Sequence, residues 1–157
     1  MIGVSSCLAG VKCTFRGDDN LIEIIKEMVA RKEAVMICPE VLGGMSIPRN
    51  PCEIRNGKVI DITGEDKTME YILGAKRSLE ILQKHGIDVV LLKAYSPSCG
   101  KNKIYDGSFT HTLINGDGIT CQMLEKNGIM VFNENEINEF FEFIEKRRVE
   151  NGAYFKG

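Results

Sequence analysis

The sequence has no tryptophan, only two histidines and four prolines, and no marked excess of either charge. Twenty Lys and Arg against 22 Asp and Glu give a net charge of −2, so no sequence-wide basic field attracts nucleic acid or an anionic membrane. No apolar run approaches the roughly 20 residues that span a bilayer. The N-terminus, MIGVSSCLAG, lacks the basic and long apolar regions of a secretory signal. We therefore predict a cytoplasmic protein without nucleic-acid or membrane partners.

The composition is that of a folded globular protein. Hydrophobic residues make up 43% of the 157 residues and charged residues 27%, which excludes a disordered or fibrous chain. This length suits one domain with its own core. We predict a single domain over residues 1–149 and a tail over residues 150–157, to which the pattern assigns no element.

Short apolar runs alternate with longer amphipathic segments along the chain. The apolar runs predict strands at Met1–Ser6, Ala34–Ile37, Val89–Leu92 and Ile129–Phe132. Apolar residues at helical spacing predict helices at Leu21–Arg31, Thr68–His85, Gly118–Asn127 and Glu134–Arg148. The alternation predicts an α/β fold: a short, mostly parallel sheet flanked by helices, Rossmann-like.

Two long irregular stretches interrupt this alternation, at Pro39–Glu65 and Ala94–Asp117. Loops of this length in a compact domain usually carry function. Asn56-Gly57 is a typical turn dipeptide and predicts a hairpin with arms Glu53–Arg55 and Lys58–Ile60. We therefore expect the functional residues in long loops at the carboxyl ends of the strands.

Six cysteines are too few for a disulfide scaffold in a chain of this length. Three of them, Cys7, Cys38 and Cys99, come shortly after predicted strands. Because the carboxyl ends of parallel strands share one edge of the sheet, these three thiols could converge in the crevice there. Each also lies in a segment of Gly, Pro or Ser that can wrap closely around a bound group.

Three converging thiolates without an evident fourth ligand suggest an iron-sulfur cluster with one open iron. Two further cysteines, Cys13 and Cys52, lie in the loops after Cys7 and Cys38, and either could be a fourth ligand, a sulfur acceptor or a bystander. Cys121 lies on a predicted helix, where core packing is the simpler interpretation. Packing alone remains the alternative for the first three thiols as well.

Other polar side chains are predicted near the same edge. Arg16 and Arg49 could bind a carbonyl oxygen or an anion bidentately, although a loop arginine is often only a surface ion-pair partner. Lys93 ends an otherwise apolar strand, so we expect it to extend into the crevice and offset negative charge there. These three residues are candidate substrate-binding groups.

Three blocks of sequence, in order, together resemble a known family. They are CLAG with Arg16-Gly17, CPEVLGG with Pro48-Arg49 and Glu53, and SPSCG with Tyr105-Asp106-Gly107. Also matching are the residues that join the second and third blocks: Gly64, Asp66, Thr68, Tyr71, Gly74 and Ala75. The chain resembles the 2-thiouracil desulfurases from Ile2 to about Glu134.

The resemblance implies an α/β fold that binds a 4Fe-4S cluster through Cys7, Cys38 and Cys99, with the fourth iron open. It implies non-redox removal of sulfur from a thiolated pyrimidine, a small-molecule substrate, and it suggests catalytic roles for Glu40 and Ser96. Ser98 is close enough in sequence that either hydroxyl could face the substrate. Glu40 follows Cys38 by two residues, so it could move a proton in the same pocket.

Two other classes of function remain open at this stage. A cluster or zinc module for binding or sensing would need Cys13 or Cys52 to close the metal site. A sulfur carrier would use Cys99 as a persulfide nucleophile and would not need the other two thiols. The aromatic face of the last helix, with Phe140, Phe141 and Phe143, could pack inside the domain or on a second subunit, so a homodimer stays open too.

Overall fold

The computed structural model describes residues 1–156, with side chains described for residues 1–150. A four-stranded sheet forms its centre, in the order β2-β1-β5-β8, and every neighbouring pair is parallel. Its strands are β1 (Ile2–Ser5), β2 (Ala34–Ile37), β5 (Val89–Leu92) and β8 (Met130–Asn133). The predicted α/β class with a parallel sheet is therefore confirmed.

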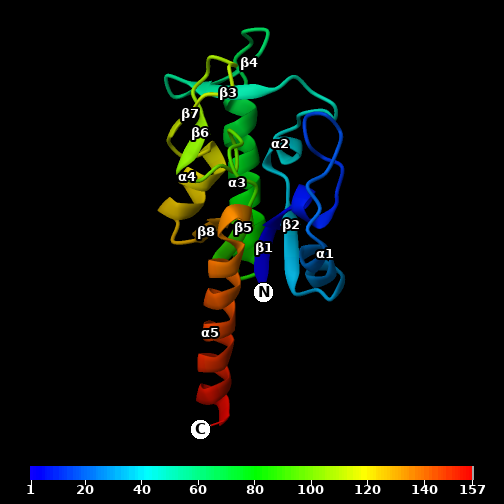
Figure 1. The fold of residues 1–157 in the computed structure, drawn as a ribbon, viewed down its shortest axis with the longest axis vertical. Coiled ribbons are helices and arrows are strands. Elements are labelled where there is room, and N and C mark those ends of the chain that lie inside the picture. Colours follow the sequence, from blue (N-terminus) through cyan, green and yellow to red (C-terminus); the bar gives the residue numbers. More distant parts are fainter. Residues whose placement is uncertain (157) are drawn as a thin grey trace.

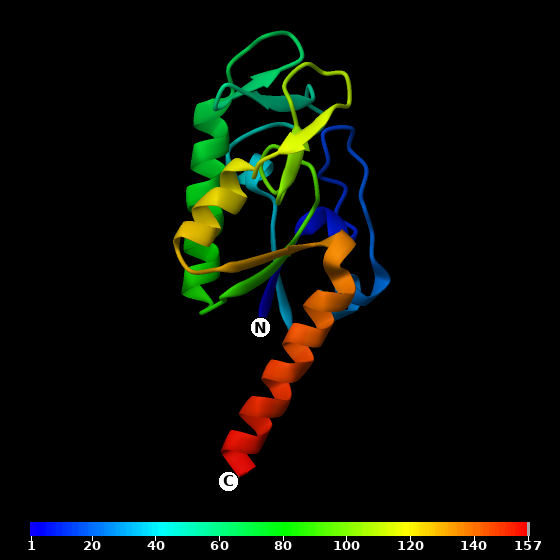
Figure 2. The same cartoon turned by 60° about the vertical axis from the view of Figure 1, so that its left-hand side comes forward.

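Helices cover both faces of this sheet (Figures 1 and 2). The long helices are α1 (Glu23–Ala30), α3 (Thr68–Lys84), α4 (Ile119–Lys126) and α5 (Ile137–Lys156). One core cluster joins β1 to Ile25 and Met28 of α1 and to Phe140 of α5. A second joins β5 to Leu82 of α3 and Leu124 of α4. The sheet is thus buried on both faces, which explains why the central strands read as continuous apolar runs.

The two long irregular stretches each contain a hairpin. The predicted one is present as β3 (Cys52–Arg55) and β4 (Lys58–Asp61), with Asn56 and Gly57 at the turn, both at positive φ. The second, β6 (Lys103–Tyr105) with β7 (Leu113–Asn115), was not expected from the sequence. Both hairpins lie beyond the carboxyl end of the sheet, at the top of Figure 1. They extend the loops that surround the strand ends.

Three short helical segments lie next to strand ends. Ser6–Ala9 (η1) follows β1, Pro39–Leu42 (α2) follows β2 one residue later, and Glu134–Glu136 (η2) follows β8. Each therefore begins at the carboxyl edge of the sheet. The predicted sulfur ligands of the first two strands belong to these segments or adjoin them.

Helix α5 projects away from the sheet toward the C-terminus (Figure 2). Residues 150–156, to which the sequence analysis assigned no element, continue this helix, and Gly157 lies outside the described residues. The first turns of α5 pack against the domain, because Phe140 is fully buried. Its ring lies edge to face with that of Phe132 of β8, and the two ring centroids are 5.5 Å apart. The aromatic face of the helix thus finds partners inside the domain.

No helix among the described residues is both long and apolar enough to cross a membrane.

Candidate active site

One cavity of about 400 Å³ opens at the carboxyl ends of β1, β2 and β5. Every site residue predicted from the sequence lies on its lining: Cys7, Arg16, Cys38, Glu40, Arg49, Lys93, Ser96, Ser98 and Cys99. Residues that are up to 92 positions apart in the sequence are thereby brought to one place by the parallel sheet. This edge is where open α/β sheets bind ligands.

Cys7 lies in the short η1 turn directly after β1. Its carbonyl oxygen accepts the N–H groups of Gly10 at 3.2 Å and Asn20 at 3.0 Å. Gly10 ends the turn at φ +94°, a left-handed conformation that glycine adopts at little cost. The thiol is buried, with 8% of the residue exposed.

Cys38 follows β2 and occupies the N-cap position of α2. Its carbonyl oxygen accepts the N–H of Leu42 at 2.9 Å, and Pro39 takes the first helical position, where its missing N–H costs nothing. Cys38 is half-buried. The same short helix carries Glu40, so the thiol and the carboxylate are positioned by one element.

Cys99 lies in the loop after β5, and serine hydroxyls surround its sulfur atom. The hydroxyls of Ser5 and Ser98 each lie 3.6 Å from its Sγ as donors. The Ser96 hydroxyl accepts the backbone N–H of Cys99 at 2.7 Å. Hydrogen bonds of this kind orient a metal ligand and tune its charge.

The three thiols differ in how readily they lose a proton. Burial raises the pKa of Cys7 to about 11 and that of Cys99 to about 12. A hydrogen bond from the side chain of Cys13 lowers the pKa of Cys38 below its usual value. Because metal ligands must be deprotonated, a bound metal would have to displace the protons of Cys7 and Cys99.

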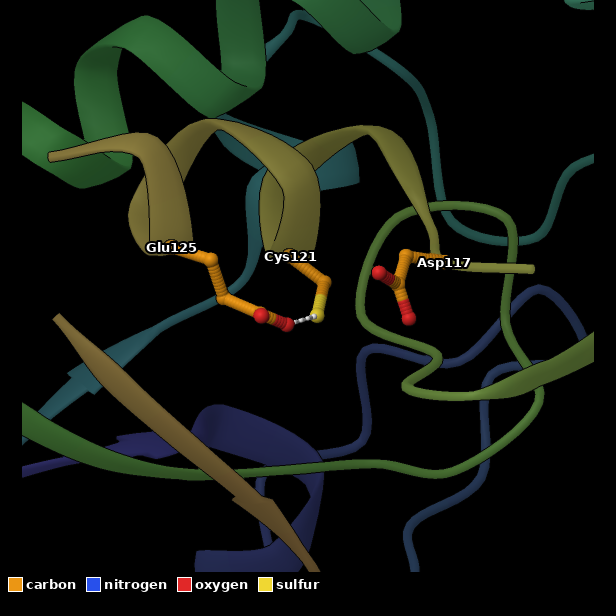
Figure 3. A group of neighbouring side chains, drawn as sticks. All are labelled: Asp117, Cys121 and Glu125. Atoms are coloured by element: carbon orange, nitrogen blue, oxygen red, sulfur yellow. Dashed lines mark hydrogen bonds between the residues drawn. The ribbon is translucent and has the colours of Figure 1, made fainter. Parts of the chain in front are cut away.

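The spacing of the thiols bears on which metal group they suit. Among the described residues, only Asp117, Cys121 and Glu125 bring three ligand atoms within 4.8 Å of one another (Figure 3). At least two of the sulfur atoms of Cys7, Cys38 and Cys99 are therefore more than 4.8 Å apart, whereas three thiolates on one zinc ion lie about 3.8 Å apart when each Zn–S bond is about 2.3 Å. A 4Fe-4S cluster binds each thiolate on a different iron and does not require the three sulfur atoms to lie that close together.

The Asp117, Cys121 and Glu125 group lies on and before α4, and none of it lines the cavity. The thiol of Cys121 donates to Glu125 at 3.0 Å, and Asp117 accepts the N–H of Asn102 at 2.7 Å. Cys121 is fully buried in the core with Leu124. These hydrogen bonds explain the group without a metal, and Cys121 packs in the core as expected.

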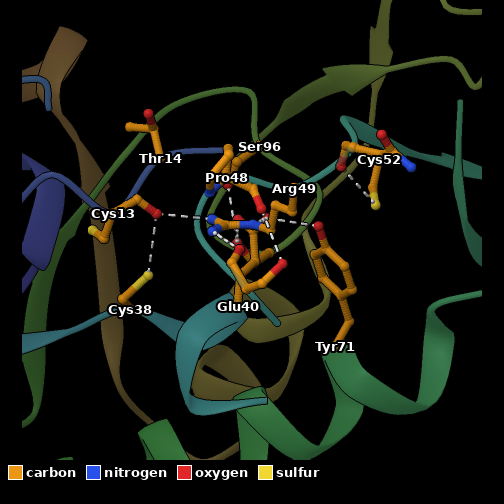
Figure 4. Close-up of polar contacts among 12 residues, drawn as sticks. Cys13, Thr14, Cys38, Glu40, Pro48, Arg49, Cys52, Tyr71 and Ser96 are labelled. Carbon is orange, nitrogen blue, oxygen red and sulfur yellow. Dashed lines mark hydrogen bonds and ion pairs between the residues drawn. The ribbon is translucent and has the colours of Figure 1, made fainter. Parts of the chain in front are cut away.

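Cys13 and Cys52 both line the cavity, on different sides. Cys13 is buried, and its carbonyl oxygen accepts weakly from the Cys38 thiol, 4.0 Å away. Figure 4 shows Cys52 on the opposite side of Arg49 from Cys13 and Cys38. The thiol of Cys52 lies 3.7 Å from the carbonyl oxygen of Asn50. Of the two, only Cys13 lies beside a predicted ligand.

Glu40 is the centre of a hydrogen-bond network (Figure 4). Its Oε1 accepts from the Tyr71 hydroxyl at 2.7 Å and from Arg49 Nε at 3.2 Å. Its Oε2 accepts from the Ser98 hydroxyl at 3.0 Å, and the Ser96 hydroxyl lies 3.3 Å beyond. Both serines therefore belong to one series of hydrogen-bonded groups that starts at Glu40, and Ser98 is the one next to the carboxylate.

The predicted cationic residues are placed differently from one another. Arg49 is almost completely buried and donates to the carbonyl oxygens of Cys13 and Ser46 as well as to Glu40. Lys93 lines the cavity but pairs with Glu134 at 2.5 Å, so its charge is balanced by a protein carboxylate. Arg16 is exposed at the cavity and lies over the ring of Phe15.

Sequence reasoning did not assign a role to several residues in or beside the cavity. Tyr71 was named only among the residues that join the matching blocks, which gave no sign that its hydroxyl meets Glu40. Tyr105 and His111 come from the unexpected second hairpin and meet edge to face at 6.0 Å. His111 is exposed and contacts this tyrosine. Only the pairing of β6 with β7 could have indicated their place.

The fold and the cavity define a class: an α/β protein with three thiols and an acid–serine network at the carboxyl edge of a parallel sheet. A model of the 2-thiouracil desulfurase family matches residues 2–136, and the chain belongs to this family of enzymes. An uncharacterised protein of Bacillus subtilis strain 168, YbbK, is 42% identical over 149 residues, which cover 88% of this chain and 99% of YbbK. Among solved structures, the [4Fe-4S]-dependent thiouracil desulfidase TudS is similar with a TM-score of 0.87 and 35% identity, covering 92% of this chain and 97% of that one.

Proposed function

We propose that this protein removes sulfur from a thiolated pyrimidine such as 2-thiouracil by non-redox hydrolysis, using a 4Fe-4S cluster. The thiocarbonyl and one water become a carbonyl and hydrogen sulfide, so no electron donor is needed. The observation that carries the proposal is the meeting of Cys7, Cys38 and Cys99 with the Glu40 network in one cavity. Membership of the family and the likeness to TudS support it.

Cys7, Cys38 and Cys99 would hold the cluster, each from the loop after a different strand. When bound through three cysteines, the cluster supplies an open iron, a Lewis acid that favours sulfur. Ser5 would donate to the Cys99 sulfur and so help to balance the negative charge of the ligand. The donor chemistry fits this group, because iron-sulfur clusters are held by cysteine thiolates.

Glu40 and the two serines would handle the protons. Water that adds to the thiocarbonyl carbon must lose a proton, and the departing sulfur must gain one. Oε2 of Glu40 reaches the cavity through Ser98 and then Ser96, so this chain can pass a proton along hydroxyls. Arg49 fixes the carboxylate from the opposite side and is itself fixed by two backbone carbonyls.

The decisive experiment is an anaerobic assay on protein whose iron and acid-labile sulfide have been measured. We expect a brown protein that releases sulfide and uracil from 2-thiouracil in equal amounts. Running 4-thiouracil and a 2-thiolated nucleoside in parallel identifies the preferred substrate. Full cluster content without sulfide release from any thiolated pyrimidine would refute the proposal, as would a colourless active protein.

The sulfur-carrier alternative has less support. Cys99 is 4% exposed, and burial raises its thiol pKa to about 12, whereas a persulfide carrier needs an accessible thiolate. That alternative predicts that Cys99→Ser alone abolishes sulfur transfer. The cluster proposal predicts equal loss of iron from changes at all three cysteines.

A further inference from the structure

Tyr71 has no place in the proton chain described above, yet its hydroxyl makes the shortest hydrogen bond to Glu40. The residue lies in the first turn of α3 and is 1% exposed. We propose that Tyr71 is the positioning residue that holds Glu40 in its reactive orientation. This inference rests on the proposed proton-transfer role of Glu40.

The two oxygens of the Glu40 carboxylate have separate partners. Oε1 accepts hydrogen bonds from the Tyr71 hydroxyl at 2.7 Å and from Arg49 Nε at 3.2 Å. Oε2 accepts a hydrogen bond only from the Ser98 hydroxyl. With Oε1 held by two donors, rotation of the carboxylate is opposed and Oε2 stays directed at the serines. A carboxylate that moves a proton needs this fixed geometry, because displacement of about 1 Å can cost much of the rate.

Packing alone does not require a tyrosine at this position. The ring contributes to a small core cluster with Cys52 and Val59, and a phenylalanine ring would fill the same space. A buried hydroxyl, however, costs free energy unless it finds a hydrogen-bond partner. Glu40 is the partner that the Tyr71 hydroxyl has, and burial raises the pKa of Tyr71 well above its usual value, so the group stays a donor.

The two residues are also held in one rigid unit. Gly43, which follows α2, lies against Gly74 of α3 so closely that neither position has room for a Cβ. Glu40 therefore stands on a short helix fixed to the helix that carries Tyr71. The distance between hydroxyl and carboxylate is thus determined by backbone packing and not by a mobile loop.

The test compares Tyr71→Phe with Ser78→Ala, which removes another buried hydroxyl from the same helix. Ser78 donates to the carbonyl oxygen of Gly74 at 2.7 Å and does not line the cavity. Iron content, unfolding temperature and affinity for the product uracil are measured for each variant, together with kcat and KM for 2-thiouracil. Glu40→Gln and the double variant Tyr71→Phe/Glu40→Gln complete a cycle.

We expect Tyr71→Phe to lower kcat roughly tenfold, because it removes one hydrogen bond to a charged group. KM, iron content and uracil affinity should stay at wild-type values, and Ser78→Ala should keep the wild-type kcat. The double variant should be no slower than Glu40→Gln alone, because Tyr71 acts only through Glu40.

The outcomes separate the inference from the function on which it rests. A wild-type kcat in Glu40→Gln refutes the proton-transfer role. Impaired Glu40→Gln with a wild-type kcat in Tyr71→Phe refutes only the positioning role of Tyr71. Additive losses in the double variant, or loss of iron in Tyr71→Phe, would show that the hydroxyl serves the fold instead.

Discussion

Gly43 and Gly74 bring two helices into backbone contact. A Cβ on Gly74 would lie 1.8 Å from the carbonyl oxygen of Pro39, and a Cβ on Gly43 would lie 2.0 Å from the carbonyl oxygen of Glu70. Short helix α2 therefore rests directly on α3. Because Cys38 caps α2 and Glu40 lies within it, this contact determines where a predicted cluster ligand and a predicted catalytic acid stand.

The first prediction follows from this contact. Glycine to alanine normally stabilises a helix by about 1 kcal/mol, but Gly74→Ala should destabilise this protein and displace α2 from α3. We expect loss of most of the bound iron and of desulfuration. Gly64→Ala is the matched control, because Gly64 lies at φ +92° with open space around it. That variant should lose stability through backbone strain and still bind iron; equal iron content in both would contradict the argument.

The second prediction concerns the three thiols. Cys7→Ser, Cys38→Ser and Cys99→Ser should each lose iron and acid-labile sulfide after anaerobic reconstitution, since a cluster with an open iron has no spare protein ligand. Cys121→Ala should retain both, because Cys121 lies in the core outside the cavity. Normal iron in any one of the three serine variants would remove that cysteine from the ligand set.

The third prediction decides the role of Cys13. This buried thiol lies beside Cys38 in the cavity, so it is the residue best placed to close the cluster. Under the proposed function Cys13→Ser keeps its iron, its visible spectrum and its sulfide release. A Cys13 that ligates the fourth iron would instead give a variant with an altered spectrum and faster turnover, since the vacant position would then be open from the start.

Glu53 gives a fourth prediction, about access to the cavity. This buried carboxylate accepts the N–H groups of Gly107 and Phe109, both at 3.0 Å, and so fixes the loop between β6 and β7. In Glu53→Ala both donors lose their partner, which costs about 1–3 kcal/mol for each buried group. We expect a raised KM for 2-thiouracil at unchanged iron content. Glu65→Ala removes an exposed carboxylate that does not line the cavity, so it should leave KM as it is.

Much of the site was predictable because it follows from strand order alone. Val89–Leu92 is apolar at every position, which indicates a strand buried on both faces, and such strands occur in parallel sheets. Once the sheet is parallel, Cys7, Cys38 and Cys99 must lie at the same edge. Convergence of these thiols thus needed no knowledge of side-chain packing.

The parts that were missed depend on contacts between distant residues. Lys103–Tyr105 and Leu113–Asn115 are too short and too polar to predict strands, and the loop between them turns at Phe109 and His111, which take positive φ without being glycine. Lys93 was expected to extend into the crevice and offset negative charge there, and it does line the cavity, but Glu134 pairs with it from 41 residues away. The sequence around a residue does not indicate a partner that lies so far away along the chain.

The last prediction uses the ion pair that ties α5 to the start of β5. Arg147 donates to both oxygens of Asp88, at 2.6 and 2.9 Å, and this holds the pKa of Asp88 below its usual value. The charged form is therefore favoured in the folded state, so the stabilisation is present above the unfolded pKa of about 3.9 and is lost as the pH falls through the lower folded value.

Both side chains are about half exposed, so Asp88→Asn should cost at most about 1 kcal/mol at pH 7. Urea unfolding of metal-free protein, followed by circular dichroism from pH 7 to pH 3, should show this difference shrinking with acid, and high salt should shrink it at pH 7 as well. A difference that is the same at pH 3 as at pH 7 would mean that Asp88 acts through packing and not through its charge.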